Sequence, residues 1–253
     1  MKLNDFVQHL SQMLDIGKFE KADFSLNGLQ VGNLDKDIRK IAFAVDASLD
    51  TIKEAADNGA DVLFVHHGLF WGRPIAITGL HYERVKTLLD RNLALFACHL
   101  PLDSNMEFGH NACIAKKLEL ENIQPFSLYN GLYVGAKGSL PKALNADEII
   151  KKSGIITNAS NYSINTEGKT FKNIGIVSGD GADDFRNAIK DGLDLLITGE
   201  SKYSTVNDCR EMGFSMLCLG HYETEVFGLK AMLNYVSSTM GLETCFIDKP
   251  LGL

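Results

Sequence analysis

One pattern of predicted strands and helices occurs twice in the chain, and this repetition constrains the fold more than any other feature. Gly59 and Gly192 stand at corresponding places in two similar six-residue segments, and they lie 133 residues apart. The strand that begins at Ile41 has its counterpart at Ile174, at the same offset. Matching elements in constant register indicate a duplicated unit. We therefore expect two α/β repeats, at residues 1–125 and 126–253.

Within each repeat, short apolar segments alternate with longer amphipathic ones. The apolar segments are almost continuously hydrophobic, which indicates strands buried on both faces of a parallel sheet. The amphipathic segments carry helix signals, such as Ser48 as a cap and Gly59 as a stop. The predicted strands are 40–45, 61–65, 93–98, 174–177, 194–197 and 215–219, and the predicted helices are 48–58, 82–92, 110–120 and 183–190. Ahead of each set we expect a helix and a short strand, at 4–15 and 27–32 and at 146–152 and 162–165, with an extra strand at 133–140.

Composition is that of an ordinary globular protein. The chain has 253 residues, 45% of them hydrophobic and 23% charged, with a formal net charge of −7. No apolar run approaches the roughly 18 residues that a membrane span needs, and residues 1–10 lack the apolar stretch of a signal peptide. We therefore expect a soluble, cytoplasmic protein. The acidic balance and the lack of basic runs disfavour a nucleic-acid partner.

The five cysteines are odd in number and widely spaced, with no Cys-X-X-Cys pair. This pattern argues against a disulfide framework and against a zinc–thiolate site. We expect reduced thiols, and Cys98, inside a predicted strand, is typical of a thiol in the core.

Polar side chains follow three of the predicted strands, where sites form in open α/β sheets. His66 and His67 follow strand 61–65, residues 99–103 follow strand 93–98, and residues 220–225 follow strand 215–219. A single histidine at such a place is more often a satisfied core residue than a ligand. A tandem pair at a strand end is different, because histidine is the commonest transition-metal ligand and each ring can turn to a different ion.

Carboxylates complete the candidate site. His221 and Glu225 are four residues apart, which places them on one face of a helical turn. Asp103 lies in a predicted loop that Pro101 stiffens. Three imidazoles and two carboxylates suit two divalent ions bridged by a carboxylate, and this mixed ligand set is compatible with Zn, Fe, Mn or Co.

These segments resemble a known family. Residues 66–71 (His-His-Gly-Leu-Phe-Trp), 99–103 (His-Leu-Pro-Leu-Asp) and 220–225 (Gly-His-Tyr-Glu-Thr-Glu) are similar to the signature segments of the Ngg-interacting-factor-three-like family. Its bacterial and archaeal members usually carry the name GTP cyclohydrolase 1 type 2. Residues 27–32 and 198–200 also resemble motifs of that family, so the likeness extends over nearly the whole chain.

The resemblance implies an α/β fold of two intertwined α-β-(βα)3-type repeats, with mixed, mostly parallel sheets and helices on both faces. It also implies two divalent metal ions per chain. By motif position, one ion would take His67 and Asp103, the other would take His66 and His221, and Glu225 would bridge them. Members of the family commonly assemble as ring-like homohexamers, which composition and spacing alone do not indicate.

Several further residues have both a functional and a structural interpretation. His99 is expected near the metals, as an acid/base group or as a partner of a ligand. Glu200 and Glu223 are candidate acid/base groups or plain exposed carboxylates. The turn Gly179-Asp180-Gly181 could cradle phosphate through backbone N–H groups, but Asp180 would repel an anion, so we favour a strand-to-helix turn with Asp180 as a cap. Structural roles are also favoured for Asn27, Gln30, Phe70, Trp71, His9, His81 and His110.

Two functions remain open on these residues. The first is a di-metal hydrolase similar to GTP cyclohydrolase 1 type 2, in which a water bridging two ions attacks a nucleotide or related substrate. The second is a non-catalytic protein for metal binding, metal handling or regulation. No P-loop or arginine cluster supports GTP in particular.

Overall fold

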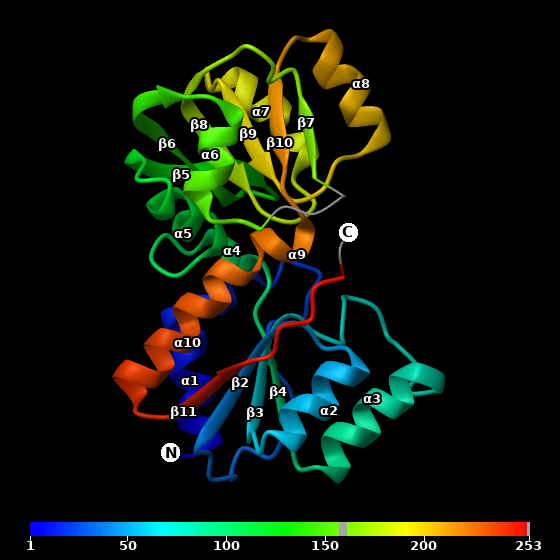
Figure 1. The fold of residues 1–253 in the computed structure, drawn as a ribbon. Coiled ribbons are helices and arrows are strands. Elements are labelled where there is room, and N and C mark those ends of the chain that lie inside the picture. Colours follow the sequence, from blue (N-terminus) through cyan, green and yellow to red (C-terminus); the bar gives the residue numbers. More distant parts are fainter. Residues whose placement is uncertain (157–160, 252–253) are drawn as a thin grey trace. The chain divides into compact units, whose positions relative to one another are not determined.

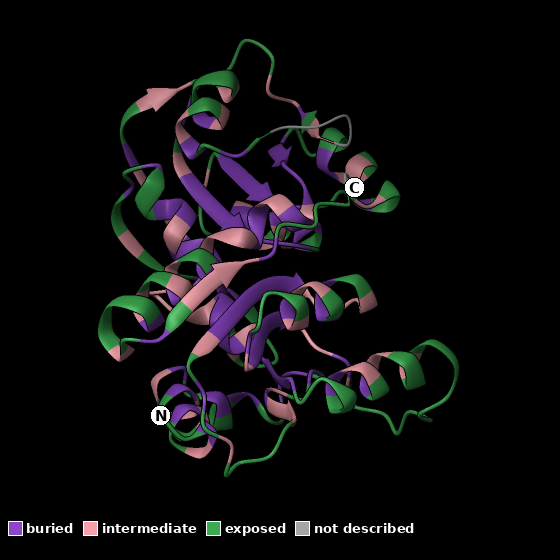
Figure 2. Ribbon diagram, turned by 60° about the horizontal axis from the view of Figure 1, so that its bottom comes forward, coloured by how far each residue is buried: buried purple, intermediate pink, exposed green. Residues whose placement is uncertain are grey.

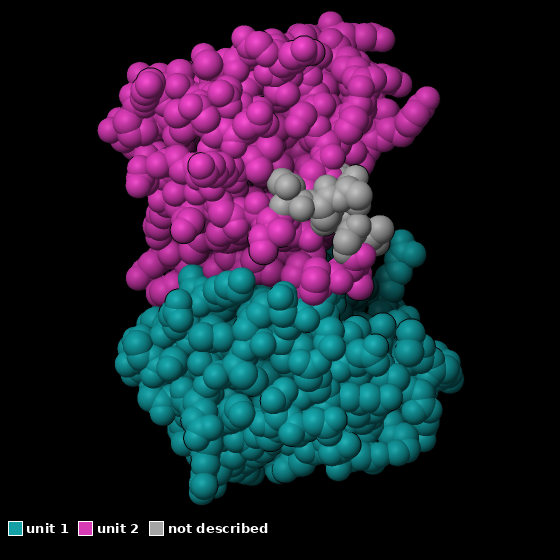
Figure 3. Space-filling model, in the orientation of Figure 1, with its two compact units in different colours: residues 1–102, 229–249 teal, residues 103–228, 250–253 magenta. Residues whose placement is uncertain are grey.

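The structure is a computed structural model that describes residues 1–156 and 161–251. The chain forms two compact units (Figure 3): residues 1–102 with 229–249, and residues 103–228 with 250–253. These units differ from the predicted repeats, 1–125 and 126–253. Asp103 belongs to the second unit and not to the first, and residues 229–249 return to the first because strand β11 (Glu243–Phe246) pairs in parallel with β2 (Lys40–Asp46).

The first unit contains a five-stranded sheet in the order β1-β4-β3-β2-β11 (Figure 1). Strands β2, β3, β4 and β11 are parallel, and β1 runs antiparallel to β4 at one edge. The remaining strands are β1 (Gly28–Val31), β3 (Val62–His67) and β4 (Ala94–Ala97), and the helical elements are α1 (Leu3–Met13), η1 (Ile16–Phe19), α2 (Leu49–Asp57) and α3 (Gly79–Asp90).

Helices cover both faces of this sheet. Alternate residues of β2, β3 and β4 pack with Ile52 of α2 and Leu88 of α3 in one apolar cluster. On the opposite face Phe43, Phe64 and Phe96 stack side by side, and Phe6 of α1 meets Phe96 edge-on at 6.2 Å between ring centroids. Because both faces are covered, the central strands are buried throughout, as Figure 2 shows, which explains their continuous apolar sequences.

The second unit contains a six-stranded sheet in the order β5-β6-β8-β9-β10-β7. Apolar residues of α5 and α6 pack on one face, and apolar residues of α7 and α8 pack on the other. Its strands are β5 (Glu121–Tyr129), β6 (Leu132–Leu144), β7 (Tyr162–Ile164), β8 (Phe171–Val177), β9 (Leu195–Thr198) and β10 (Ser215–Cys218). Its helical elements are α5 (His110–Lys117), α6 (Ala146–Ser153), η2 (Ala182–Asp184), α7 (Phe185–Lys190), α8 (Tyr203–Glu211) and α9 (His221–Thr224).

The chain passes from one unit to the other within two helices. Helix α4 (Leu100–Ser104) contains the first passage, and α10 (Val226–Met240) contains the return. No helix in residues 1–156 and 161–251 is long and apolar enough to cross a membrane.

The predicted repetition is present in both sheets. The order β1-β4-β3-β2 recurs as β7-β10-β9-β8, with the first strand antiparallel to the second in each case. Individual hydrogen bonds keep the offset of 133 residues. Asp61 accepts the backbone N–H groups of Arg39 and Lys40, and Asp194 accepts those of Lys172 and Asn173. The predicted α/β class with two mixed sheets and helices on both sides is confirmed.

The sequence patterns did not predict β5, α8, α10 or β11. Strands β5 and β11 lie at sheet edges, and most of their residues are exposed or half-buried, so they lack the continuous apolar sequence of a central strand. Helix α8 is largely polar, and Thr205 and Cys209 are its buried residues. Edge elements bury little surface, so hydrophobic periodicity in the sequence is weak there.

Candidate metal centre

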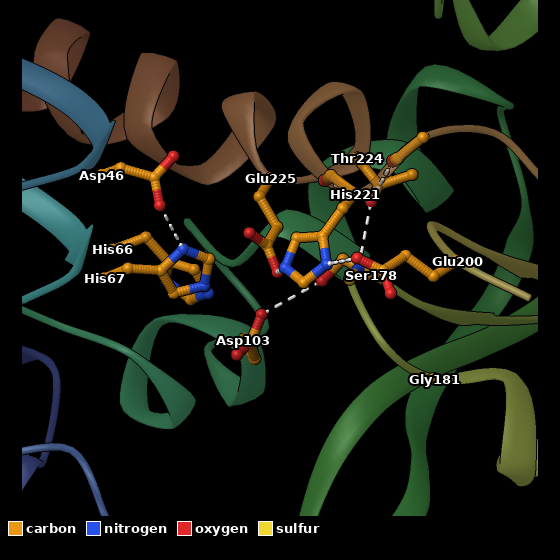
Figure 4. Close-up of polar contacts among 12 residues, drawn as sticks. Asp46, His66, His67, Asp103, Ser178, Gly181, Glu200, His221, Thr224 and Glu225 are labelled. Carbon is orange, nitrogen blue, oxygen red and sulfur yellow. Dashed lines mark hydrogen bonds and ion pairs between the residues drawn. The ribbon is translucent and has the colours of Figure 1, made fainter. Parts of the chain in front are cut away.

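The two tandem histidines are the last two residues of β3, which extends beyond its predicted end. His66 is fully buried, and its Nδ1 donates to the backbone oxygen of Cys98 at 2.9 Å. The Nδ1 of His67 lies 2.9 Å from Oδ1 of Asp46, the last residue of the neighbouring strand β2 (Figure 4). Since each Nδ1 faces an oxygen acceptor, each ring presents Nε2 as its metal-binding nitrogen.

The chain turns sharply after His67, and Gln30 of β1 holds this turn. Gln30 Oε1 accepts the N–H of Leu69 at 2.7 Å, and its Nε2 donates to the backbone oxygen of Leu26. A Cβ atom at Gly68 would lie only 2.4 Å from Gln30 Nε2, so glycine is required there. The structural role predicted for Gln30 is therefore present.

A third imidazole, that of His99, lies beside this pair in the first unit. Its Nδ1 is 2.9 Å from Oδ1 of Asp23, whose side chain is 1% exposed. Burial alone would raise the pKa of Asp23, but hydrogen bonds from His99, Asn27 and the Ser25 amide outweigh it and lower that pKa. Asp23 is thus held as a carboxylate and fixes the orientation of His99.

Asn27 and Trp71 support this arrangement. The Asn27 side chain donates to Asp23 and accepts the backbone N–H of His99. The Trp71 indole donates to the backbone oxygen of Gly68 and meets the His99 ring edge-on, with 5.0 Å between centroids. Both residues anchor loops, as the sequence indicated, and both loops are the ones that carry imidazoles.

In the second unit, His221 and Glu225 lie together. His221 begins α9, and its Nε2 is 3.1 Å from Oε1 of Glu225, a buried carboxylate. On its other side, Nδ1 of His221 lies 2.6 Å from Glu200 Oε1 (Figure 4). Burial by itself would lower the pKa of His221, but the two carboxylates outweigh it and raise that pKa to about 10. This pocket therefore stabilises positive charge at the imidazole.

Asp103 is also buried in the second unit, where its Oδ1 accepts the Ser178 hydroxyl at 3.1 Å. It lies in helix α4 and not in the predicted loop. Pro101, which suggested the loop, fits the first turn of a helix, where its missing N–H costs no hydrogen bond. One ring nitrogen of His110, for which a structural role was favoured, lies within 4.8 Å of an Asp103 oxygen.

Two glycines allow the backbone to approach the His221–Glu225 pair. A Cβ atom on Gly179, whose φ is 62°, would lie 2.2 Å from Glu225 Oε1 and 3.1 Å from His221 Nε2. A Cβ atom on Gly199 would lie 2.8 Å from the Cα of His221. Residues 198–200 therefore support His221 through a close backbone approach and through the Glu200 carboxylate.

The turn after β8 has no amide pair directed at an anion. The N–H of Gly179 donates to Thr224, and the N–H of Gly181 donates to Thr198. Asp180 forms an ion pair with Lys202 at 3.0 Å and does not cap the following helix. The favoured strand-to-helix turn is present, but the capping role predicted for Asp180 is wrong, because its side chain reaches Lys202 instead.

Each unit thus gathers its own share of the predicted site residues. His66 and His67 lie together with His99 in the first unit, and Asp103, His221 and Glu225 lie in the second. Sequence analysis missed Asp23, Asp46 and Ser178, which hold these side chains. The position of Asp46 at the end of an apolar strand was a usable signal, whereas nothing near Asp23 indicated a contact 76 residues away.

Three of the remaining candidates have local roles. His9 bonds to Tyr235 at 2.7 Å, and His81 packs edge-on against Phe70. Glu223 lies in α9, where its carboxylate approaches Gly220.

Comparisons with known proteins give a consistent result. A family model described as Duf34/NIF3 (NGG1p interacting factor 3) matches residues 1–250. The chain is 43% identical over 254 residues to a protein of Deinococcus radiodurans named GTP cyclohydrolase 1 type 2 homolog, covering 99% of this chain and 94% of that one. A protein of the same name from Halobacterium salinarum is 39% identical over the full length of both chains.

Solved structures show the same likeness. TTHA1606 from Thermus thermophilus has a TM-score of 0.88 at 33% identity over all of both chains. Reduced HcgD from Methanocaldococcus jannaschii has a TM-score of 0.85 at 29% identity over 98% of each. With a family model matched along residues 1–250 and relatives of this identity over its length, the chain belongs to the Duf34/NIF3 family.

Proposed function

We propose that this protein binds two divalent metal ions through His66, His67, Asp103, His221 and Glu225, and that it uses them to hydrolyse a nucleotide or a related small molecule. One observation carries the proposal. In each of the three histidines, Nδ1 faces an oxygen of the same unit: the Cys98 carbonyl, the Asp46 carboxylate or the Glu200 carboxylate.

This pattern is typical of metal-binding histidines. A ligating imidazole almost always donates its other ring N–H to a carboxylate or a backbone carbonyl, which fixes the tautomer and increases the basicity of the ligating nitrogen. Core histidines that only fill space have no need for the same nitrogen to be engaged each time. The repeated use of Nδ1 therefore favours a cation at Nε2.

The buried carboxylates support the same proposal. Asp103 and Glu225 are 7% and 3% exposed, and a buried carboxylate is costly without compensating positive charge or hydrogen bonds. The 3.1 Å between His221 Nε2 and Glu225 Oε1 suits two ligands of one ion, since metal bonds to these atoms are about 2.0–2.2 Å.

The assignment of all five ligands to one dinuclear centre remains a proposal that draws on the family resemblance. Chain connectivity agrees with it. Asp103 is the first residue after the passage into the second unit, and Glu225 lies three residues before Gly228, the last residue ahead of the return.

Bound divalent ions would supply Lewis-acid polarisation and would lower the pKa of water to near neutral. The chain's own residues would orient the ligands: Asp46 and Glu200 through Nδ1 of His67 and His221, and Ser178 through the Asp103 carboxylate. The relatives' name, GTP cyclohydrolase 1 type 2 homolog, supports testing purine nucleotides first. Because the amides of Gly179 and Gly181 bond to threonines, we do not assign phosphate to that turn.

The test combines metal content with turnover. Protein stripped with a chelator and reloaded with Zn, Fe, Mn or Co is analysed for metal and incubated with a panel of nucleotides and phosphoesters. We expect two ions per chain and turnover of at least one compound. Glu225→Gln should lose an ion and the turnover, whereas His9→Gln, a matched histidine of the first unit, should lose neither.

Full metal occupancy with no turnover on any compound would exclude hydrolysis of this panel and favour a metal-handling or regulatory protein. Occupancy below one ion per chain would contradict metal binding itself.

Assembly as a homohexameric ring is likewise a proposal that rests on the family resemblance. Light scattering after size-exclusion chromatography should give six times the 27.8 kDa chain mass, and a monomer would contradict it.

A further inference from the structure

The first unit contains three imidazoles in one cluster. One ring nitrogen from each of His66, His67 and His99 lies within 4.8 Å of the other two. The ring centroids are 4.7 Å apart for His66 and His67, 5.0 Å for His66 and His99, and 5.7 Å for His67 and His99. The five ligands proposed above include only two of these rings.

We propose that His66, His67 and His99 form a three-imidazole site that holds one divalent transition-metal ion within the first unit, without ligands from the second. This inference rests on the proposed metal centre and deepens it, because it identifies His99 as an additional ligand. It also gives an order of loading, with the first ion bound by nitrogen alone and the carboxylates of the second unit needed for the other ion.

The geometry of the cluster suits such an ion. Ligands of a tetrahedral zinc ion lie about 3.3 Å apart, since Zn–N bonds are about 2.0–2.1 Å. Nitrogens within 4.8 Å of one another reach that spacing by small ring rotations. Three histidine ligands with an open fourth position are an established arrangement for a catalytic ion.

The orientation of the rings supports ligation by all three. Every Nδ1 in the cluster is engaged by an oxygen of the first unit: Cys98 for His66, Asp46 for His67 and Asp23 for His99. His99 therefore has the same hydrogen-bonding pattern as the two histidines already proposed as ligands. A ring that only packed against its neighbours would not need a buried carboxylate behind it.

Asp23 is built to hold His99 in place. Its Oδ1 also accepts the Ser25 amide at 2.9 Å, and its Oδ2 accepts the Asn27 side chain at 2.8 Å and the Leu100 amide at 3.0 Å. With these donors the carboxylate keeps its charge and cannot turn away. Carboxylates in this position increase metal affinity, and their removal costs about 10–100-fold. Asp23 is therefore a positioning residue.

The sole tryptophan provides a direct readout of this site. Trp71 lies 5.0 Å from His99 and 6.1 Å from His67 between ring centroids. A paramagnetic ion such as Cu²⁺ or Co²⁺ bound by these rings would quench its fluorescence strongly. The measurement needs no substrate and reports on the first unit alone.

The experiment uses the full chain with the second unit's ligands removed, as the triple variant Asp103→Asn, His221→Gln, Glu225→Gln. We expect one ion per chain by elemental analysis, with a Cu²⁺ affinity from Trp71 quenching within about tenfold of the first site in the unmodified protein. Electron paramagnetic resonance should show hyperfine coupling to three nitrogens.

Additional substitutions in this background test His99. His99→Gln should weaken Cu²⁺ binding at least tenfold and reduce the coupling to two nitrogens. Asp23→Asn should weaken binding about tenfold while three nitrogens remain coupled. His9→Gln should change neither, and circular dichroism confirms the fold of each variant. If His99→Gln fails to fold, the nitrogen count of the folded triple variant decides the question.

Two results would overturn the inference: a triple variant that binds no ion, or nitrogen coupling that is the same with and without His99. Neither result affects the proposed function if the unmodified protein binds two ions per chain. Conversely, a single ion per chain in both the unmodified protein and the triple variant would support the three-imidazole site and contradict the two-metal function.

Discussion

At the scale of single residues, what lies behind each imidazole decides what the imidazole can do. Asp46, Asp23 and Glu200 all bond to the Nδ1 of a histidine, and each comes from a segment distant in the sequence from its partner. A carboxylate in this position increases the basicity of Nε2, and a backbone carbonyl such as that of Cys98 does so less. Of the four rings, that of His66 should therefore be the weakest nitrogen donor.

Glycine at position 179 is required by the second-unit carboxylate. We predict that Gly179→Ala weakens metal binding at least tenfold, because the new Cβ would lie 2.2 Å from Glu225 Oε1. Gly59→Ala is the matched control, since Gly59 also has positive φ (72°) but has open space where a Cβ would be. Both changes should destabilise the fold by about 1–2 kcal/mol. Calorimetric metal titration of both variants tests this, and equal affinities would contradict it.

At the scale of elements, the two sheets start in the same way. In each repeat an aspartate ahead of the second central strand accepts two N–H groups from the start of the first: Asp61 bonds to Arg39 and Lys40, and Asp194 bonds to Lys172 and Asn173. These bonds fix the register of β2 against β3 and of β8 against β9. The repetition is therefore present in individual hydrogen bonds as well as in strand order.

The first of these aspartates gives a pH prediction. Burial alone would raise the pKa of Asp61, but the Arg39 and Lys40 amides and the Lys36 ammonium outweigh it and lower that pKa. The unfolded chain then binds more protons in acid, so this stabilisation is full above the ordinary aspartate pKa of about 3.9 and is lost as pH falls through the folded value.

We predict that Asp61→Asn lowers the free energy of unfolding by about 1–2 kcal/mol at pH 7, and that the difference shrinks towards zero near pH 3. Urea denaturation at both pH values measures it. Asp57→Asn is the control, because that carboxylate forms an exposed ion pair with Arg91 and should contribute little. A deficit that is the same at both pH values would contradict the assignment.

Helix α6 begins with a reciprocal cap. Asn145 Oδ1 accepts the N–H of Glu148, and the Glu148 carboxylate accepts the N–H of Asn145, both at 2.9 Å. We predict that Asn145→Ala costs about 1 kcal/mol and increases hydrogen exchange at the Glu148 amide. The exposed Lys142→Ala should leave that amide unchanged. Unaltered exchange in Asn145→Ala would show that the cap does not stabilise the helix.

At the scale of the whole molecule, stability comes from apolar layers on both faces of two sheets and not from covalent links. All five cysteines are reduced thiols, and Cys98, Cys209 and Cys218 are buried. Burial raises the pKa of Cys209 to about 11 and that of Cys218 to about 12. Thiols in this state are poor nucleophiles, since the thiolate is the reactive form.

We therefore predict that a thiol reagent at pH 8 labels the native protein incompletely. The half-buried Cys113 and Cys245 should react first, and all five thiols should react only after unfolding in denaturant. Labelling followed by mass spectrometry of peptides identifies the sites. Rapid reaction of Cys218 in the native state, or fewer than five thiols in the unfolded state, would contradict this description.

The sequence by itself determined the class of fold and the residue types of the candidate site. Continuous apolar strands, amphipathic helices and the offset of 133 residues follow from local pattern, because burial on both faces leaves no choice of polar residues there. The segments with His66, His67, His221 and Glu225 stand at strand ends, where topology predicts sites. Edge elements such as β5 and β11 escaped prediction, since they bury too little surface to require an apolar pattern.

Only the tertiary structure decided which residues hold the imidazoles and how the chain divides. The contact of Asp23 with His99 spans 76 residues, and that of Ser178 with Asp103 spans 75, so no local spacing indicates either one. Residues 103–228 form one unit and the chain then returns to the first, because β11 completes a sheet begun about 200 residues earlier. Such pairings depend on which surfaces meet after folding, and sequence patterns describe surfaces one element at a time.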